Sequence, residues 1–160
     1  MRPLSKDLRE FIRLLQAQEV EYVIVGAWSL AFHGRPRYTG DLDLFIRPAV
    51  DNAGRLMRVL EEFGFGQTGI AREDFLKPDY VIQLGTEPNR IDLLTGISGV
   101  SFEEAWRQRV PGRLGDLEVW FLSRDLLIRN KRAARRAKDL DDIHLLEQTR
   151  PEPSRTKPPT

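Results

Sequence analysis

The sequence contains no cysteine, so it can form no disulfide and carry no thiolate chemistry. Its charges almost cancel, and the net charge is only +1, so any attraction for nucleic acid must come from local basic patches. No apolar run approaches the roughly 20 residues that a membrane-spanning helix needs. No signal-peptide pattern follows Met1. We therefore expect a cytoplasmic protein without a membrane segment.

What the sequence does contain is typical of a globular domain. Hydrophobic residues make up 41% and charged residues 31% of the 160 positions. A chain of this length can bury about 70% of its unfolded surface as one domain. We predict a single domain over residues 1–148, with a core at 20–122 and a helical C-terminal segment at 123–148. Residues 149–160, which are rich in proline, are expected to form a disordered tail.

The most informative stretch runs from residue 22 to residue 46. Its apolar start, Tyr22-Val23-Ile24-Val25, predicts a buried strand because β-branched and aromatic residues dominate it. Gly26 ends the run, a short helix is expected over residues 27–33, and Gly34 closes it. A second strand is predicted over residues 40–46.

Two aspartates alternate with leucines in that second strand. Side chains two residues apart on a strand share a face and lie about 7 Å apart, so Asp41 and Asp43 can converge on one point. Aspartate is a poor strand residue, and like charges repel unless a cation lies between them. The pair therefore indicates a metal site that faces a phosphate cradle at Gly26. The alternative is an ordinary solvated face of an edge strand.

The middle of the chain supplies one more candidate. Residues 80–84 and 90–94 predict an antiparallel hairpin. Asp92 lies in the second of these strands among apolar residues, where an isolated carboxylate is strongly destabilising unless it is paired or bound to metal. Three further helices are expected: one with Ser5 as its cap and apolar residues at helical spacing up to Leu15, one that Asp51 caps and that reaches Phe63, and one over 102–109 with a Ser101 capping box. A turn is expected at Pro111-Gly112, and a last strand over 117–122 is followed by a cap at Ser123. Residues 67–78 predict either one helical turn or a loop.

The helix predicted from Arg124 carries most of the concentrated positive charge. Its apolar positions fall on one arc of roughly 120°, but an unbroken helix would put Asp141 in that arc, so a break is expected near residues 138–140. The basic side chains form two groups: a stripe of Arg129, Arg132 and Arg136, and a cluster of Lys131, Arg135 and Lys138. An ordinary solvated helix face would explain the arginines equally well.

Together these residues resemble a known family. Gly26-Ala27-Trp28-Ser29, followed about a dozen residues later by Asp41-Leu42-Asp43, resembles the first motifs of the polymerase-beta-like nucleotidyltransferases. Arg37-Tyr38-Thr39-Gly40 is similar to the segment that leads into those aspartates, and Lys131 with Lys138-Asp139-Leu140 and Asp142 is similar to the C-terminal motif. The likeness is strongest to small bacterial members, which include toxins of toxin–antitoxin pairs.

The resemblance implies a fold and a reaction. The fold is an α/β domain with a mixed, twisted sheet of about five strands, helices on one face and a helical C-terminal segment. The reaction is Mg²⁺-dependent transfer of a nucleoside monophosphate from a nucleoside triphosphate to an acceptor. Asp41 and Asp43 would hold two Mg²⁺ ions, with Mn²⁺ as a possible substitute, and Asp92 would be the third carboxylate.

The same resemblance assigns the remaining candidate residues. Those expected to bind nucleotide phosphates are Gly26, Ala27, Ser29, Arg37, Thr39, Lys131 and Lys138, with Asp139 and Asp142 in support. The positive charge concentrated on this helix, and not the resemblance, suggests that the arginine stripe binds the acceptor, for which RNA or tRNA is narrowly favoured. Other interpretations stay open: a degenerate relative that binds nucleotide or RNA without turnover, a toxin-like protein controlled by an antitoxin partner, or a nuclease.

Overall fold

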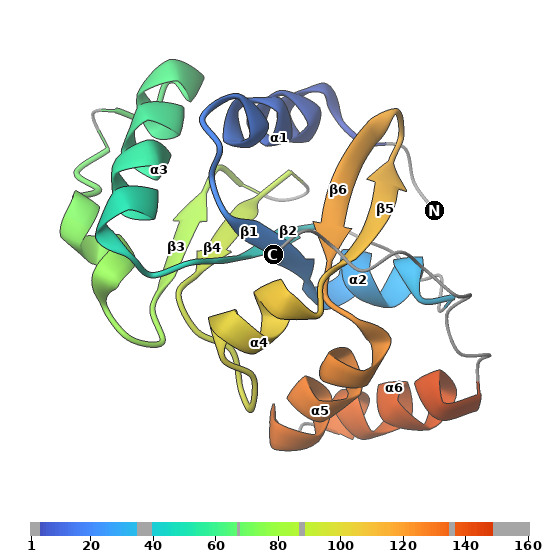
Figure 1. The fold of residues 1–160 in the computed structure, drawn as a ribbon. Helices are drawn as coiled ribbons and strands as arrows, with labels where there is room; N and C mark the ends of the chain where they lie inside the picture. The colour runs from blue at the N-terminus through green and yellow to red at the C-terminus, as the bar shows by residue number, and fades with distance from the viewer. Residues whose placement is uncertain (1–3, 35–39, 67, 87–88, 135–136, 149–160) are drawn as a thin grey trace.

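The computed structural model describes residues 4–34, 40–66, 68–86, 89–134 and 137–148 (Figure 1). The helices are α1 (Lys6–Ala17), α2 (Gly26–Phe32), α3 (Val50–Phe63), α4 (Phe102–Arg107), α5 (Arg124–Ala134) and α6 (Ala137–Gln148), with a 3-10 helix η1 (Arg72–Leu76). The strands are β1 (Tyr22–Val25), β2 (Leu42–Ile46), β3 (Val81–Leu84), β4 (Ile91–Leu94), β5 (Val110–Leu114) and β6 (Leu117–Phe121). Among these helices, none combines the length and the apolar character that crossing a bilayer requires.

The strands form one mixed sheet in the order β3-β4-β2-β1-β6-β5. β1 and β2 lie at its centre and run antiparallel to each other. β4 pairs with β2 in parallel, and β6 pairs with β1 in parallel. β3 and β5 complete antiparallel hairpins at the two edges. The predicted α/β class with a mixed sheet is confirmed, and the sheet has six strands.

Helices cover both faces of this sheet (Figure 1). Alternate side chains of β1 explain why: Tyr22 and Ile24 pack in a core with α1 and α3, whereas Val23 and Val25 pack in a second core with α4, α5 and α6. Helices were expected on one face of the sheet, in addition to the C-terminal segment, and α1 and α3 are the helices on that face. The second face is covered by α4 together with the C-terminal segment.

The additional strand corrects the predicted turn at Pro111-Gly112. Both residues lie in β5, which pairs with β6 in a register that places Pro111 opposite Trp120. Proline lacks an N–H but is tolerated at a sheet edge, and β5 is an edge strand. A Cβ at Gly112 would lie 2.6 Å from the Phe32 ring. Gly112 is thus there for close packing and not for a turn.

The predicted serine caps are confirmed. Ser5 and Ser123 accept N–H groups of α1 and α5 at 3.2 Å, and Ser101 forms the expected capping box with Glu104. The predicted Asp51 cap is wrong, because α3 begins one residue earlier with Ala49 at its N-cap. The ambiguous segment 67–78 contains the short helix η1.

The C-terminal segment is divided as expected, but at a different place. α5 ends at Ala134 and α6 already begins at Ala137, so residues 138–140 lie within the second helix. The break predicted there is therefore placed a few residues too late. The two helices pack against each other beside α4 at the bottom of Figure 1.

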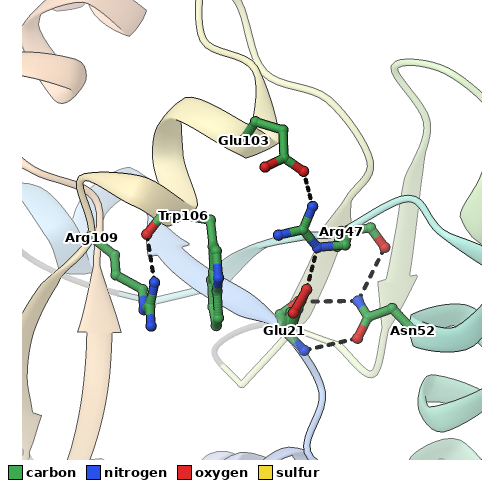
Figure 2. Close-up of polar contacts among 6 residues, drawn as sticks. All are labelled: Glu21, Arg47, Asn52, Glu103, Trp106 and Arg109. Carbon is green, nitrogen blue, oxygen red and sulfur yellow. Dashed lines mark hydrogen bonds and ion pairs between the residues drawn. The ribbon is translucent and has the colours of Figure 1, made fainter. Parts of the chain in front are cut away.

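A polar cluster closes the end of β1 and β2 where β1 begins and β2 ends (Figure 2). Arg47, the residue after β2, forms ion pairs with Glu21 and Glu103. Asn52 donates to the backbone carbonyls of Glu21 and Arg47 at 3.1 and 3.0 Å, and its Oδ1 accepts the N–H of Glu21 at 2.8 Å. We call Glu21, Arg47, Asn52 and Glu103 the Arg47 cluster.

Arg109 lies near this cluster and stacks between two tryptophans. Its guanidinium lies 3.6 Å from the ring centroid of Trp106 and 4.3 Å from that of Trp120. Its Nη1 donates to the carbonyl of Trp106 at 2.7 Å. The stacking joins the end of α4 to β6.

Candidate active site

The predicted aspartates lie at the opposite end of β1 and β2 from the Arg47 cluster. Parallel pairing of β2 with β4 places Asp43 directly beside Asp92. Asp41 lies just before β2, and Val25 at the end of β1 is the partner of Asp43 on the other side. The three carboxylates therefore gather on two adjacent strands, beside the point where β1 passes into α2. We call Asp41, Asp43 and Asp92 the carboxylate site.

Gly26 makes the close approach of Asp43 possible. It has a φ of +68°, a conformation that favours glycine. A Cβ at this position would overlap Oδ2 of Asp43 and would lie 3.1 Å from its Cγ. The sequence pattern suggested that Gly26 leaves room for a phosphate. In the structure, the group that Gly26 leaves room for is the carboxylate of Asp43.

Arg90 is part of the carboxylate site, and the sequence analysis missed it. Its Nη2 lies 2.9 Å from Oδ2 of Asp41, and its Nε lies 2.9 Å from Oδ1 of Asp92. A second hydrogen bond, from Nη2 to Oδ2 of Asp92 at 3.1 Å, makes the contact with Asp92 bidentate. The signal was present, because residues two apart on a strand share a face. By itself this signal is weak, because an arginine at the start of a strand is ordinarily solvated.

One arginine does not balance the three carboxylates. The pKa of Asp43 is raised to about 7, first by its burial and then by the charge of Asp92, by a hydrogen bond with Asp92 and by the charge of Asp41. Arg90 opposes this rise only in part. Near neutral pH, Asp43 is therefore protonated part of the time. The site carries an excess of negative charge that a further cation would relieve.

The donor set suits a hard divalent cation. Mg²⁺ prefers carboxylate oxygens, and the carboxylate site supplies them on two adjacent strands. The position of the Arg90 guanidinium shows that positive charge fits between Asp41 and Asp92. Across the described residues, however, no group of three acidic, histidine or cysteine side chains is already arranged around a metal position. The carboxylates have the chemistry that such an ion prefers, but in this structure Arg90 occupies the space between Asp41 and Asp92.

The predicted phosphate cradle is only partly present. Gly26 and Ala27 begin α2 beside Asp43 and are partly exposed. Ser29 is fully buried, and its hydroxyl has no hydrogen-bond partner among the described residues. Ser29 lies on the buried side of α2, so its side chain is in the interior and not at the surface of a phosphate cradle. Arg37 and Thr39 lie outside the described residues.

Lys131 has an internal partner. Its Nζ lies 3.0 Å from Oδ2 of Asp142, and both side chains are buried between α5 and α6. A phosphate role for Lys131, as predicted, would require that this ion pair open. The contact that the structure gives Asp142 is this ion pair with Lys131. The side chains of Lys138 and Asp139 lie outside the described part of the chain.

The two described members of the predicted arginine stripe form ion pairs with different helices. Arg129 forms an ion pair with Glu104 on α4, and Arg132 pairs with Glu147 on α6 at 2.6 Å. The two side chains therefore reach toward different helices, although both remain about half exposed. Arg136 lies outside the described residues.

Comparison with known proteins bears on the whole chain. A family model described as "Nucleotidyl transferase of unknown function (DUF2204)" matches residues 4–156. No match is found among curated proteins. One solved structure with a similar fold is the lincosamide antibiotic adenylyltransferase LnuA with lincomycin bound. The TM-score is 0.56 at 12% sequence identity, over 92% of this chain and 99% of that one.

These findings agree with the geometry. The structural likeness, at this identity, concerns the fold, and it confirms the nucleotidyltransferase-like architecture that the motifs predicted. The family match covers nearly the entire chain, including β2, β4 and the two C-terminal helices. The chain therefore belongs to the family of nucleotidyl transferases of unknown function.

Proposed function

We propose that the protein transfers a nucleoside monophosphate from a nucleoside triphosphate to an acceptor hydroxyl, with release of pyrophosphate, at the carboxylate site. The observation that carries this proposal is the parallel register of β2 and β4, which places Asp43 beside Asp92 next to Asp41. The raised pKa of Asp43 supports it, because burial and then the charges of Asp92 and Asp41 disfavour the ionised carboxylate, as is common at functional sites.

A divalent cation, Mg²⁺ or Mn²⁺, bound by these carboxylates would neutralise triphosphate oxygens and polarise the acceptor hydroxyl. Asp41 and Asp43 would hold the cation that binds the nucleoside triphosphate, and Asp92 would hold the cation at the acceptor hydroxyl. The partly exposed backbone at Gly26 and Ala27 would approach the phosphates. In the free protein Arg90 shields two of the three aspartates.

A small hydroxyl-bearing molecule is the acceptor that we favour. Of the arginines expected to track an RNA backbone, Arg129 and Arg132 form ion pairs with Glu104 and Glu147. The adenylyltransferase of similar fold was solved with lincomycin, a small molecule. An RNA or tRNA acceptor, and control by an antitoxin partner, stay predictions from the sequence.

The proposed function is tested by label transfer. The protein is incubated with each labelled nucleoside triphosphate, Mg²⁺ or Mn²⁺, and either total RNA or a panel of hydroxyl-bearing small molecules. We expect label on one acceptor class together with pyrophosphate. Asp43→Asn should remove nearly all transfer, and Asp125→Asn, a change at a side chain that is 88% exposed, should not. Transfer by Asp43→Asn at the rate of the unmodified protein would contradict the proposal.

A further inference from the structure

The partners of Arg90 are the same carboxylates that are proposed to bind the divalent cation. Its Nε and Nη2 together engage both oxygens of Asp92, and Nη2 also reaches Oδ2 of Asp41. An oxygen lone pair that accepts an N–H of arginine is not available to a metal ion at the same time. Two positive charges a few ångströms apart also repel each other. A divalent cation bound to these oxygens would therefore compete with Arg90.

The backbone of Arg90 is fixed, whereas its side chain has room to move. Its carbonyl accepts the N–H of Leu42 at 3.0 Å, which anchors the residue at the start of β4 beside β2. Its side chain is 27% exposed, against 11% for Asp92. The guanidinium can therefore rotate outward without unfolding the strand, while the aspartates stay in place.

We propose that Arg90 is an internal cation that holds the carboxylate site closed in the free protein, and that a divalent cation must displace it. This proposal rests on the proposed function, because it takes the carboxylate site to be where the metal binds. Arg90 is then a regulating residue: it sets the metal affinity of the site and stabilises the free protein. It also explains why the carboxylates are not already arranged around a metal position.

The test is a titration of the protein with MnCl₂ alone, followed by calorimetry, without nucleotide. Arg90→Met removes the internal cation and should tighten Mn²⁺ binding about tenfold, within the usual range for linked ligands. Arg90→Lys keeps the charge but loses the two-nitrogen contact with Asp92, so its Mn²⁺ affinity should lie between those of Arg90→Met and the unmodified protein. Arg113→Met is the matched control, since Arg113 pairs with Glu118 on the β5–β6 hairpin. Its Mn²⁺ affinity should equal that of the unmodified protein.

A second measurement separates competition from a purely structural ion pair. Without metal, Arg90→Met should melt at a lower temperature than the unmodified protein, because the aspartates lose their counter-ion. Saturating Mn²⁺ should raise the melting temperature of Arg90→Met by more than that of the unmodified protein. If Arg90→Met fails to fold, Arg90→Lys carries the same test with a smaller expected shift.

The outcomes distinguish this proposal from the function on which it rests. Mn²⁺ binding that is lost in Asp43→Asn but unchanged or weaker in both Arg90 variants would overturn the role of Arg90 alone. Binding that is unaffected by Asp43→Asn, or absent from all variants, would overturn the metal site and the role of Arg90 with it. Tighter binding in Arg90→Met that is lost again in Arg90→Met/Asp43→Asn supports both.

Discussion

The two ends of β1 and β2 carry similar side chains in different balance. The Arg47 cluster sets one guanidinium against two glutamates, and Asn52 pairs with the adjacent backbone groups. The carboxylate site sets one guanidinium against three aspartates. With Arg109, whose charge interacts with that of Glu21, the first end has two guanidinium groups against two glutamates, whereas the second has an excess of carboxylates. The strands that connect them are the most buried in the sheet, so both ends are held by the same rigid scaffold.

The two ends differ in how their pKa values are shifted. Burial lowers the pKa of Arg47, but hydrogen bonds and charges from Glu21 and Glu103 outweigh it and raise the pKa overall. The charged form of Arg47 is therefore favoured. At Asp43, burial and the neighbouring aspartates raise the pKa to about 7, which disfavours the charged form. The carboxylate site therefore lowers the stability of the folded protein near neutral pH, which is common at functional sites.

The largest expected effect comes from removing charge at the carboxylate site. Asp43→Asn should lower the transfer rate by roughly a thousandfold, since metal-stabilised charge in a transition state is worth several kcal/mol. The same variant should be at least as stable as the unmodified protein, because it removes a destabilising charge. Single-turnover transfer and urea unfolding of the same sample measure both effects. A variant that is inactive because it is unfolded would not support the comparison.

The second effect is the pH dependence of stability without metal. The folded pKa of Asp43, about 7, lies above its unfolded value of 3.8. The folded form therefore holds this proton more tightly, and its contribution to stability is lost as the pH rises from about 4 to about 7. The loss is up to roughly 4 kcal/mol. Urea unfolding with a chelator at several pH values, compared with Asp43→Asn, isolates it. A difference between the two proteins that does not vary with pH would contradict the assignment.

The third effect concerns the balanced end. Arg47→Met leaves Glu21 and Glu103 without their partner and should lower the free energy of unfolding by about 1–3 kcal/mol. Transfer activity per folded molecule should be unchanged, because the cluster is at the far end of the strands. Arg113→Met removes a well-exposed ion pair and should change stability by less than about 0.5 kcal/mol. Lost activity in folded Arg47→Met would show that the two ends are coupled.

Local patterns were enough to predict most of the fold and the aspartates of the carboxylate site. The run Tyr22–Val25, the alternation around Asp43 and the apolar surroundings of Asp92 each depend on neighbours in sequence. β5 was missed because proline and glycine normally indicate a turn, and only packing against Phe32 explains Gly112. The roles of the carboxylates stay predictions until transfer is measured.

What local patterns could not show are contacts between distant segments. Arg90 joins Asp41 only because β4 pairs with β2, and the pairing of these strands depends on the whole sheet. Lys131 meets Asp142 only because α6 packs on α5. The positive charge of a lysine is visible in a sequence, but the carboxylate that compensates it is not.

The smallest effect is expected from the C-terminal arginines. If Arg129, Arg132 and Arg136 bound an RNA backbone freely, replacing all three by glutamine would flatten the log–log salt dependence of binding by roughly two units. The ion pairs with Glu104 and Glu147 compete with phosphate, so we expect a change of less than about one unit. Fluorescence anisotropy with single-stranded RNA at several salt concentrations measures it.

A double variant of Glu104 and Glu147 tests directly whether these ion pairs keep Arg129 and Arg132 from binding RNA. Glu104→Gln keeps the capping box, because glutamine also serves at that position, but it removes the charge that engages Arg129. Combined with Glu147→Gln it releases both arginines, at a loss of stability that should be small because exposed ion pairs contribute little. If the released arginines strengthen RNA binding and steepen its salt dependence, the helices hold a latent basic surface. If binding stays weak and flat, the acceptor is not RNA, and the excess charge of the carboxylate site acts on a small molecule.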